Sequence, residues 1–373
     1  MTLADNLFRK IDFSFFWLFT IALFACETPK EGEKHTRSNN YLEIQGFAQG
    51  TTFSIIYNDS LERDLSFAID SILNEYDREL SIYIDSSLVS KFNSVDRSPI
   101  CIADNSKYFK SCFNIAKKIF HSTNGAFNPA IYPLVSYWGF YHSSYEEVSV
   151  NSNEIDSILK LTSFEDDAFF ITVDTVKKGS IEMFTYPVVC KSVKNAKLDF
   201  NGIAQGHSVD VISDYFDFLQ IKDYFIEIGG EITVKGKNPK KESWKIGIDQ
   251  PVDNASPGSN EFQLIVALED QSLATSGNYR KFYVKDGVKY SHTIDPKTGY
   301  PVQHSLLSVT VIHEQTAFAD AFATAFMVMG VEDSKAFIES NSQLGIEAYF
   351  VFSNINGENE VWMSSGMDAF VID

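Results

Sequence analysis

The C-terminal third of the chain contains an almost wholly apolar stretch, Ala317-Phe-Ala-Asp-Ala-Phe-Ala-Thr-Ala-Phe-Met-Val-Met-Gly330. A helix built from it has no polar face, so the sequence predicts that it is buried on nearly every side. Asp320 is then a carboxylate in an apolar interior, where an ionised group needs a cation or several hydrogen-bond donors. Thr324 stands one helical turn further along the same face. Two oxygens at that spacing suit a hard cation such as Mg²⁺.

Both residues also have a structural interpretation that the sequence leaves open. The Asp320 carboxylate can be capped by neighbouring backbone amides, and the Thr324 hydroxyl can donate back to the carbonyl of residue 320 in its own helix. Neither pattern requires a metal ion. Burial rules alone therefore do not decide between a metal site and a capped carboxylate.

The N-terminal segment has the charged and apolar parts of a secretory signal. Two basic residues precede an apolar run at residues 13–25, which is too short to span a membrane comfortably. The sequence Leu23-Phe-Ala-Cys26 resembles a bacterial lipobox, in which the cysteine is lipidated and becomes the new N-terminus. We therefore expect a lipoprotein signal peptide at residues 1–25 and a lipid anchor on Cys26, at the cell membrane on the periplasmic side. A plain signal peptide and an uncleaved anchor are the alternatives.

Residues 26–40 are polar and lack any apolar period, which predicts a flexible tether. The remaining residues, 41–373, show no linker, composition shift or internal repeat, so we expect one domain although length alone would allow about two. The formal net charge of −19 argues against nucleic-acid binding, because phosphate backbones are bound by clustered Lys and Arg. An anionic ligand would therefore need a local cation.

Three cysteines remain once Cys26 is assigned to the anchor. Cys101, Cys112 and Cys190 have spacings that match no zinc or redox motif, and an odd number allows at most one internal disulfide in an exported protein. Buried free thiols are the default prediction for all three.

Apolar periodicity predicts helices and strands in irregular order. Residues 41–57 read as a β-hairpin that turns at Gln49-Gly50. Helical stripes are predicted at residues 61–80, 107–121, 203–219 and 331–340. Strands are predicted at residues 224–228, 231–235, 244–248, 262–268, 280–284, 306–312, 347–352, 360–363 and 370–372, with a hairpin turn at 286–287. Runs of strands with inserted helices, without regular βαβ alternation, indicate the α+β class.

Four glycine-containing segments are candidates for close approach of the backbone to a ligand. They are Gln49-Gly-Thr-Thr52, Asn124-Gly-Ala-Phe-Asn-Pro129, Leu198-Asp-Phe-Asn-Gly-Ile-Ala-Gln-Gly-His-Ser-Val-Asp210 and Glu227-Ile-Gly-Gly-Glu231. The third leads into a predicted helix N-terminus, where free amides and the helix dipole favour anions. Taken singly, each segment is more often a simple turn.

In their order and residue sequence, these segments and three later ones resemble the motifs of the ApbE-type flavin transferases, the FAD:protein FMN transferases. The later segments are Leu273-Ala-Thr-Ser-Gly-Asn-Tyr-Arg280, Ser291-His-Thr-Ile-Asp-Pro-Lys-Thr-Gly-Tyr-Pro301 and Ala319-Asp-Ala-Phe-Ala-Thr-Ala325. The resemblance covers about residues 46–363 and implies a T-fold-like α+β architecture of mixed antiparallel sheets with inserted helices. It also implies an Mg²⁺-dependent enzyme that cleaves FAD, attaches FMN through a phosphoester bond to a threonine of an exported redox protein, and releases AMP.

Site residues follow from the resemblance, position by position. The metal ligands fall on the backbone carbonyl of Gly202 and on the side chains of Asp320 and Thr324, while an acid that some members carry at the position of Ala323 is absent here. His292 corresponds to the histidine proposed to deprotonate the acceptor threonine, a role that suits an imidazole near neutral pH. The flavin-binding positions fall on Gln49, Tyr83, Ala126, Phe127, Asn128, Asp199, Gln205 and Ile294.

The chain departs from the family pattern at three of the flavin-binding positions. The family commonly has Met in place of Gln49, and many members have Asp in place of Asn128 and Lys or Glu in place of Gln205. The last two differences keep hydrogen bonding but change charge, so they bear on nucleotide affinity. The aromatic residues Phe127, Tyr83 and Trp138, and also His292, have an alternative interpretation as ordinary core residues.

Three other functions stay open on the sequence. The first is an FAD pyrophosphatase that uses the same metal site and gives FMN and AMP, with water in place of threonine. The second is a lipoprotein that binds FAD without chemistry, and the third is a structural surface lipoprotein. The third leaves the buried Asp320 unexplained.

Overall fold

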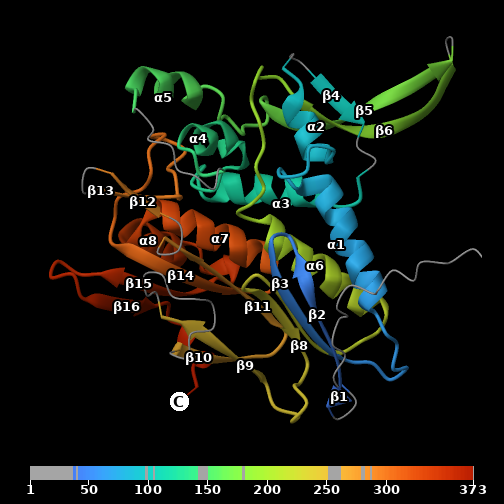
Figure 1. Cartoon of the computed structure of the whole chain (residues 1–373), viewed down its shortest axis with the longest axis vertical. Coiled ribbons are helices and arrows are strands. Elements are labelled where there is room, and N and C mark those ends of the chain that lie inside the picture. The colour runs from blue at the N-terminus through green and yellow to red at the C-terminus, as the bar shows by residue number, and fades with distance from the viewer. Residues whose placement is uncertain are drawn as a thin grey trace, which may run out of the picture. The chain divides into compact units, whose positions relative to one another are not determined.

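Helices and antiparallel strands are mixed throughout the computed structural model (Figure 1). It describes residues 37–38, 41–96, 100–103, 106–141, 150–178, 181–250, 262–278, 282–285 and 288–372. The predicted α+β class is confirmed, since strands and helices do not alternate as βαβ units. The predicted signal peptide, Cys26, Arg280 and the turn at 286–287 lie outside the described residues. Within these ranges, no helix has the length and apolar character needed to cross a membrane.

A nine-stranded sheet forms the framework, and each strand in it is antiparallel to its neighbours. Its strands, in spatial order, are β1 Arg37–Ser38, β2 Tyr41–Ala48, β3 Thr51–Asn58, β7 Asp223–Ile228, β8 Glu231–Lys235, β11 Gln271–Gly277, β14 Leu306–His313, β15 Glu347–Ser353 and β16 Asn359–Met363. The predicted hairpin at residues 41–57 is confirmed. Gln49 and Gly50 form its turn with φ of 53° and 76°.

Three helices cover one face of the sheet. Helix α6, Ala204–Phe218, lies beside α7, Thr316–Met329, and α1, Ser66–Leu80, packs against the same apolar layer (Figure 1). Ile55 of β3 faces these helices, whereas its neighbour Ile56 faces the opposite layer, because successive strand residues point to opposite sides. The predicted burial of α7 is confirmed.

A two-stranded ribbon covers the opposite face of the sheet. It consists of β9, Trp244–Asp249, and β10, Phe262–Leu268, whose apolar side chains pack against the far sides of β8, β11, β14 and β15. A hairpin of β12, Phe282–Lys285, and β13, Val288–Ser291, leads into the segment that carries His292. Further helices are α2 Leu88–Ser94, α3 Phe109–Ser122, α4 Tyr132–Tyr137, α5 Ser152–Leu159 and α8 Val331–Ser340, with 3₁₀ turns η1 Pro129–Ile131, η2 Ser342–Leu344 and η3 Met367–Ala369.

The predicted strand at residues 370–372 is wrong. The chain enters this segment from η3, and Val371 makes an isolated β-bridge with Val266 of β10 instead of a ladder. The Phe370 carbonyl accepts from Ala267 N at 2.7 Å and Ile372 N donates to the Ile265 carbonyl at 3.0 Å. The C-terminal segment therefore fastens the ribbon rather than extending the main sheet.

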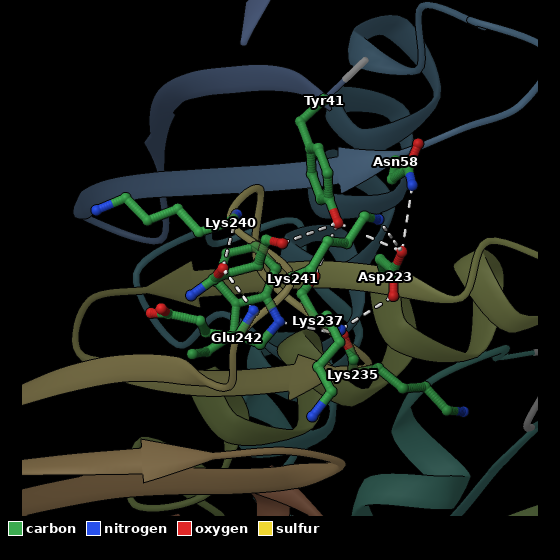
Figure 2. A network of polar contacts seen from close by, with 10 residues as sticks. Tyr41, Asn58, Asp223, Lys235, Lys237, Lys240, Lys241 and Glu242 are labelled. Carbon is green, nitrogen blue, oxygen red and sulfur yellow. Dashed lines mark hydrogen bonds and ion pairs between the residues drawn. The ribbon is translucent and has the colours of Figure 1, made fainter. Parts of the chain in front are cut away.

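A network of polar contacts fastens the start of the domain (Figure 2). Tyr41 is almost fully buried, and its hydroxyl donates to the Lys237 carbonyl at 2.9 Å. Asp223 accepts from Lys237 N at 3.0 Å and from Asn58 Nδ2 at 3.2 Å, and Lys241 Nζ lies 3.5 Å from the same carboxylate. The first full-length strand is thereby held to the connection between β8 and β9.

A second, three-stranded sheet carries a disulfide. Its strands in order are β4 Ile100–Ala103, β6 Ile181–Lys191 and β5 Phe169–Lys178. Cys101 pairs directly with Cys190 across the β4–β6 ladder, and their sulfurs are bonded. The prediction of free thiols is therefore wrong for these two residues, because strand pairing brings together positions far apart in sequence. Cys112 is buried and free, as predicted.

Removal of this disulfide is expected to lower the free energy of unfolding by roughly 2–5 kcal/mol, because the bond closes a long loop in the unfolded chain. The two cysteines are 89 positions apart. Thermal unfolding of a Cys101→Ser, Cys190→Ser double variant checks this value, with Cys112→Ala as the control that leaves the bond in place. An unchanged melting temperature in the double variant would contradict the prediction.

Candidate active site

Gly206 brings α6 and α7 into close contact. A Cβ atom at this position would lie 2.5 Å from the Thr316 carbonyl oxygen and 2.8 Å from Asp320 Cβ, so a side chain is excluded. Gly206 lies in the first turn of α6, where backbone amides lack partners within the helix. Its amide donates to Asp320 Oδ2 at 3.1 Å, which directs this carboxylate toward the α6 N-terminus.

The three predicted metal ligands lie together at this helix contact. Thr324 Oγ1 donates to the Gly202 carbonyl at 3.4 Å, and Asp320 stands one turn earlier on α7. The hydroxyl thus reaches across to the glycine segment, in contrast to the structural alternative in which it bonds back to residue 320. Ala323, the residue before Thr324, is fully buried, and its methyl side chain offers no metal ligand. The set offers one carboxylate, one hydroxyl and one carbonyl, all oxygen ligands of the kind that Mg²⁺ prefers.

The Asp320 carboxylate is incompletely compensated by protein groups. Its pKa is raised to about 7: burial is the largest cause, the Gly206 amide lowers the pKa, and the negative charge of Asp210 raises it. The single amide donor that the described residues supply therefore does not hold this group fully ionised at neutral pH. A bound cation would supply the missing stabilisation. In the part of the chain that is described, no cluster of three or more His, Cys, Asp or Glu could hold a metal, so any site here relies on the mixed oxygen set.

Asp210 is a second, half-buried carboxylate at this helix contact, and no role was predicted for it from the sequence. It projects from α6 and accepts from Thr316 N at 2.8 Å and Ala317 N at 2.9 Å, so it caps the N-terminus of α7. Burial raises its pKa to about 6, although both amides act in the opposite direction. The one indication in the sequence that Asp210 has a role at this site was its position at the end of the glycine segment 198–210. The structure shows that its role is to position the helix that carries Asp320.

Three of the four glycine segments converge at one corner of the sheet. A Cβ on Gly229 would lie 2.6 Å from Gln205 Nε2 and 2.9 Å from Thr51 Cγ2, and Gly229 N donates to the Thr52 carbonyl at 3.1 Å. Ser208 Oγ donates to Gln49 Oε1 at 3.3 Å, whereas Gln49 Nε2 is buried with no hydrogen-bond partner among the described residues. A buried donor without a partner is costly, so it suits an acceptor on a ligand.

The predicted flavin-binding residues Asp199 and Tyr83 lie on either side of Asn201. Asp199 Oδ1 accepts from Asn201 N at 2.7 Å, and Asn201 Nδ2 donates to Tyr83 Oη at 3.3 Å. Burial raises the pKa of Asp199, which is 7% exposed. Tyr83 is 67% exposed, so its alternative interpretation as a core residue does not hold. Tyr141, which no motif singled out, donates its hydroxyl to Asp199 Oδ2 at 2.5 Å.

The other flavin-binding predictions fall on more buried residues. Ala126 and Phe127 belong to the main core, and the Phe127 ring comes within 3.4 Å of a Cβ placed on Gly202. Asn128 accepts from Ala130 N and donates to the Thr162 carbonyl, both at 2.8 Å, so its side chain caps η1. Ile294 packs into a small core that includes Trp138. Their contact with flavin stays a prediction.

His292 directly follows β13 and is partly buried. A turn follows it: Gly299 N donates to the Asp295 carbonyl at 2.8 Å, and Gly299 has a φ of 78°. Trp138 is buried and its indole donates to the Gly299 carbonyl at 2.8 Å. The turn that follows the predicted base is thus held by a hydrogen bond to the residue at the C-terminal end of α4.

The raised pKa of Asp320 predicts a pH dependence for the metal-free protein. The folded state holds this proton more tightly than the unfolded chain, whose Asp titrates near 3.8, so stability is present at low pH and is lost as pH rises through about 7. The loss attributable to Asp320 is of the order of 2–4 kcal/mol. Unfolding in a chelator at pH 5 and pH 8, compared with Asp320→Asn, isolates this contribution from other groups such as His207, whose pKa burial lowers to about 4. Equal pH slopes in both proteins would contradict it.

An antiparallel sheet with inserted helices, carrying a buried carboxylate and oxygen ligands at a helix contact, defines an α+β protein with a candidate metal and nucleotide site. The chain belongs to the ApbE family, whose model matches residues 49–350. An FAD:protein FMN transferase of Vibrio cholerae is 32% identical over 334 residues, which are 87% of this chain and 91% of the relative. The one from Escherichia coli K12 is 28% identical and covers 97% of this chain and 99% of the relative.

Solved structures give the same result. The flavin transferase ApbE from Vibrio cholerae has a TM-score of 0.72 and 31% identity, and covers 88% of this chain and 99% of that one. The apo form of the flavinyl transferase ApbE from Pseudomonas stutzeri has a TM-score of 0.74 and 30% identity, with 90% and 96% covered. The ApbE architecture expected from the sequence is therefore confirmed.

Proposed function

We propose that the chain cleaves FAD, attaches FMN through a phosphoester bond to a threonine of an exported redox protein, and releases AMP. Relatives named for FMN transfer match almost the whole chain. Within this chain the proposal depends most on Asp320, a buried carboxylate without a full set of donors, placed one turn from the Thr324 hydroxyl that reaches Gly202.

We further propose that Gly202 O, Asp320 and Thr324 hold Mg²⁺. One protein carboxylate leaves coordination positions for water and for the FAD pyrophosphate. A cation there would offset the pyrophosphate charge and stabilise the departing AMP. Because the chain has a formal net charge of −19, a local cation also accounts for how it binds a dianionic pyrophosphate.

The remaining chemistry is assigned to the protein side chains. A bond forms between the acceptor threonine oxygen and the FMN phosphorus, while the bond from that phosphorus to the AMP oxygen breaks. His292 accepts the threonine proton, since a hydroxyl attacks phosphorus well only when a base removes this proton. Gln49 Nε2, which has no hydrogen-bond partner among the described residues, and the Asp199 carboxylate would orient the nucleotide.

The site of action is proposed to be the periplasmic side of the membrane, with Cys26 as the lipid attachment point. The Cys101–Cys190 disulfide supports export, because such bonds persist in oxidising compartments. Metabolic labelling with a fatty acid tests the anchor. Label is expected on the full chain and not on Cys26→Ser, and a labelled Cys26→Ser protein would overturn the assignment.

Mass spectrometry tests the transfer itself. The purified chain, given FAD, Mg²⁺ and a threonine-bearing acceptor, is expected to add the mass of FMN to that threonine, and the same acceptor with Thr→Val is the control. FMN release without an acceptor would instead identify a pyrophosphatase. Tight FAD binding with no turnover under any divalent metal would identify a binding protein.

A further inference from the structure

Tyrosines gather around the Asp199 carboxylate, and two of them lie outside every predicted site position. The Tyr141 hydroxyl donates to Asp199 Oδ2 at 2.5 Å. The Tyr141 ring stacks on Tyr132, with centroids 4.8 Å apart and an interplanar angle of 30°. Tyr83 reaches the same loop through Asn201. Three tyrosines therefore lie near a buried acceptor group.

The backbone around these residues fixes the tyrosine pair. Tyr132 opens α4, and Gly139 reverses the chain after the helix with a φ of 77°, which returns Tyr141 to the Tyr132 ring. Phe140 N donates to the Val135 carbonyl at 3.2 Å and closes this turn. The arrangement is thus built by the helix and its C-terminal turn rather than by the side chains alone.

Backbone and side-chain contacts also fix the positions of Asp199 and Tyr132. Asp199 N donates to the Pro129 carbonyl at 2.7 Å, which ties the Asp199 loop to the segment just before Tyr132. Lys197 Nζ lies 5.1 Å from the Tyr132 ring centroid, so this ring has a cation–π contact in addition to its stack. Tyr132 and Lys197 also line a cavity of about 330 Å³.

Asp199 and Tyr141 together suit a planar heterocycle that has an N–H donor at its edge. Asp199 Oδ1 accepts one hydrogen bond, from Asn201 N, whereas Oδ2 accepts from Tyr141 and, at 3.5 Å, from Asn201 Nδ2. Oδ1 therefore has a further lone pair for a ligand donor. The half-buried Tyr141 ring offers an aromatic surface beside that acceptor. An adenine amino group and the imide N–H of an isoalloxazine both fit this description.

We propose that Tyr141, supported by Tyr132, is a further substrate-binding residue that stacks on a planar nitrogen heterocycle of FAD while Asp199 accepts from the edge of that ring. The inference rests on the proposed function, because it takes FAD as the substrate. Tyr141 also positions Asp199 through its hydroxyl. Tyr132 is a positioning residue, since it acts by holding Tyr141.

Two kinds of Tyr141 variant separate the ring from the hydroxyl in the full chain. Tyr141→Ala is expected to raise the KM for FAD on the order of tenfold, with kcat changed less than about twofold, because stacking is lost in ground state and transition state alike. Tyr141→Phe keeps the ring and is expected to have a smaller effect. Tyr137→Phe, on the preceding helix α4, is the matched control and should leave the KM for FAD unchanged.

Binding of fragments identifies which ring is held, and it does not depend on turnover. A tenfold weaker affinity of Tyr141→Ala for FMN, with less quenching of flavin fluorescence, assigns the isoalloxazine. A weaker affinity for AMP with unchanged FMN binding assigns the adenine. If Tyr141→Ala fails to fold, the same measurements on Tyr132→Leu decide.

The proposal is overturned if folded Tyr141→Ala or Tyr132→Leu binds FAD, FMN and AMP as the wild-type chain does. Failure of FMN transfer in the wild-type chain is a different result, because it counts against the proposed function and leaves these affinities measurable.

Discussion

Asp320→Asn is expected to reduce FMN transfer by at least about 10²-fold, because the variant removes the single carboxylate of the proposed metal site. The amide is nearly the same size, so the packing of α6 on α7 is retained. The variant is also expected to lose the stabilisation that Mg²⁺ gives to the wild-type chain. Without metal above pH 7 it should be at least as stable as wild type, because it no longer buries a charge.

Asp210→Asn is the matched control for this variant, since it alters the other carboxylate at the same helix contact. Asp210 accepts two amides of α7, and an amide side chain can satisfy only one of them. A lower melting temperature with retained stabilisation by Mg²⁺ is expected. Thermal unfolding with and without Mg²⁺ makes the comparison. Wild-type transfer or an intact Mg²⁺ response in Asp320→Asn would sink the metal assignment.

His292→Ala is expected to lower kcat for transfer by about 10²–10⁴-fold, the range typical of a lost general base. Binding of FAD and stabilisation by Mg²⁺ should persist, because His292 belongs to neither proposed ligand set. The loss should shrink as pH rises and hydroxide takes over the proton. Steady-state kinetics from pH 6 to 9, read by mass spectrometry of the acceptor, measure both effects.

His121→Ala is the control for the histidine variant. His121 lies on α3, where Nε2 is 3.2 Å from Asp166 at the surface, and it is expected to leave transfer unchanged. A kcat of His292→Ala within about threefold of wild type across this pH range would remove His292 from the mechanism.

The local hydrophobic pattern of the sequence was sufficient to predict the helices and strands in which that pattern is regular. The hairpin ending at Tyr57 and the wholly apolar α7 are found where the sequence placed them, because alternation and continuous apolarity translate directly into strand and buried helix. The short helix α2 and the pair β5–β6 were not predicted. A seven-residue helix has barely two turns in which to show a period, and β5–β6 forms part of a peripheral sheet.

Contacts between distant segments could not be derived from local pattern. The pairing of Cys101 with Cys190 depends on strand register, and the Asp210 cap on α7 joins residues more than a hundred positions apart. Gly206 looked like a ligand-binding glycine, yet its main structural role is to let two helices touch. Burial and helical spacing suggested Asp320 and Thr324 as a pair, whereas Gly202 joined the proposed metal ligands only through the family resemblance, which encodes such contacts implicitly.

The position of the disulfide divides the candidate site into two parts, which we expect to differ in their sensitivity to reducing agents and to chelators. The covalent loop from Cys101 to Cys190 encloses Phe127, Tyr132 and Tyr141, whereas Asp320 and its helix lie outside it. Reducing agents should therefore increase local opening, seen as faster amide hydrogen exchange, in the part of the protein that is proposed to bind the ring system of FAD. Chelators should act on the α6–α7 contact instead. Reduction of the disulfide and removal of the metal would then destabilise different parts of the proposed catalytic centre.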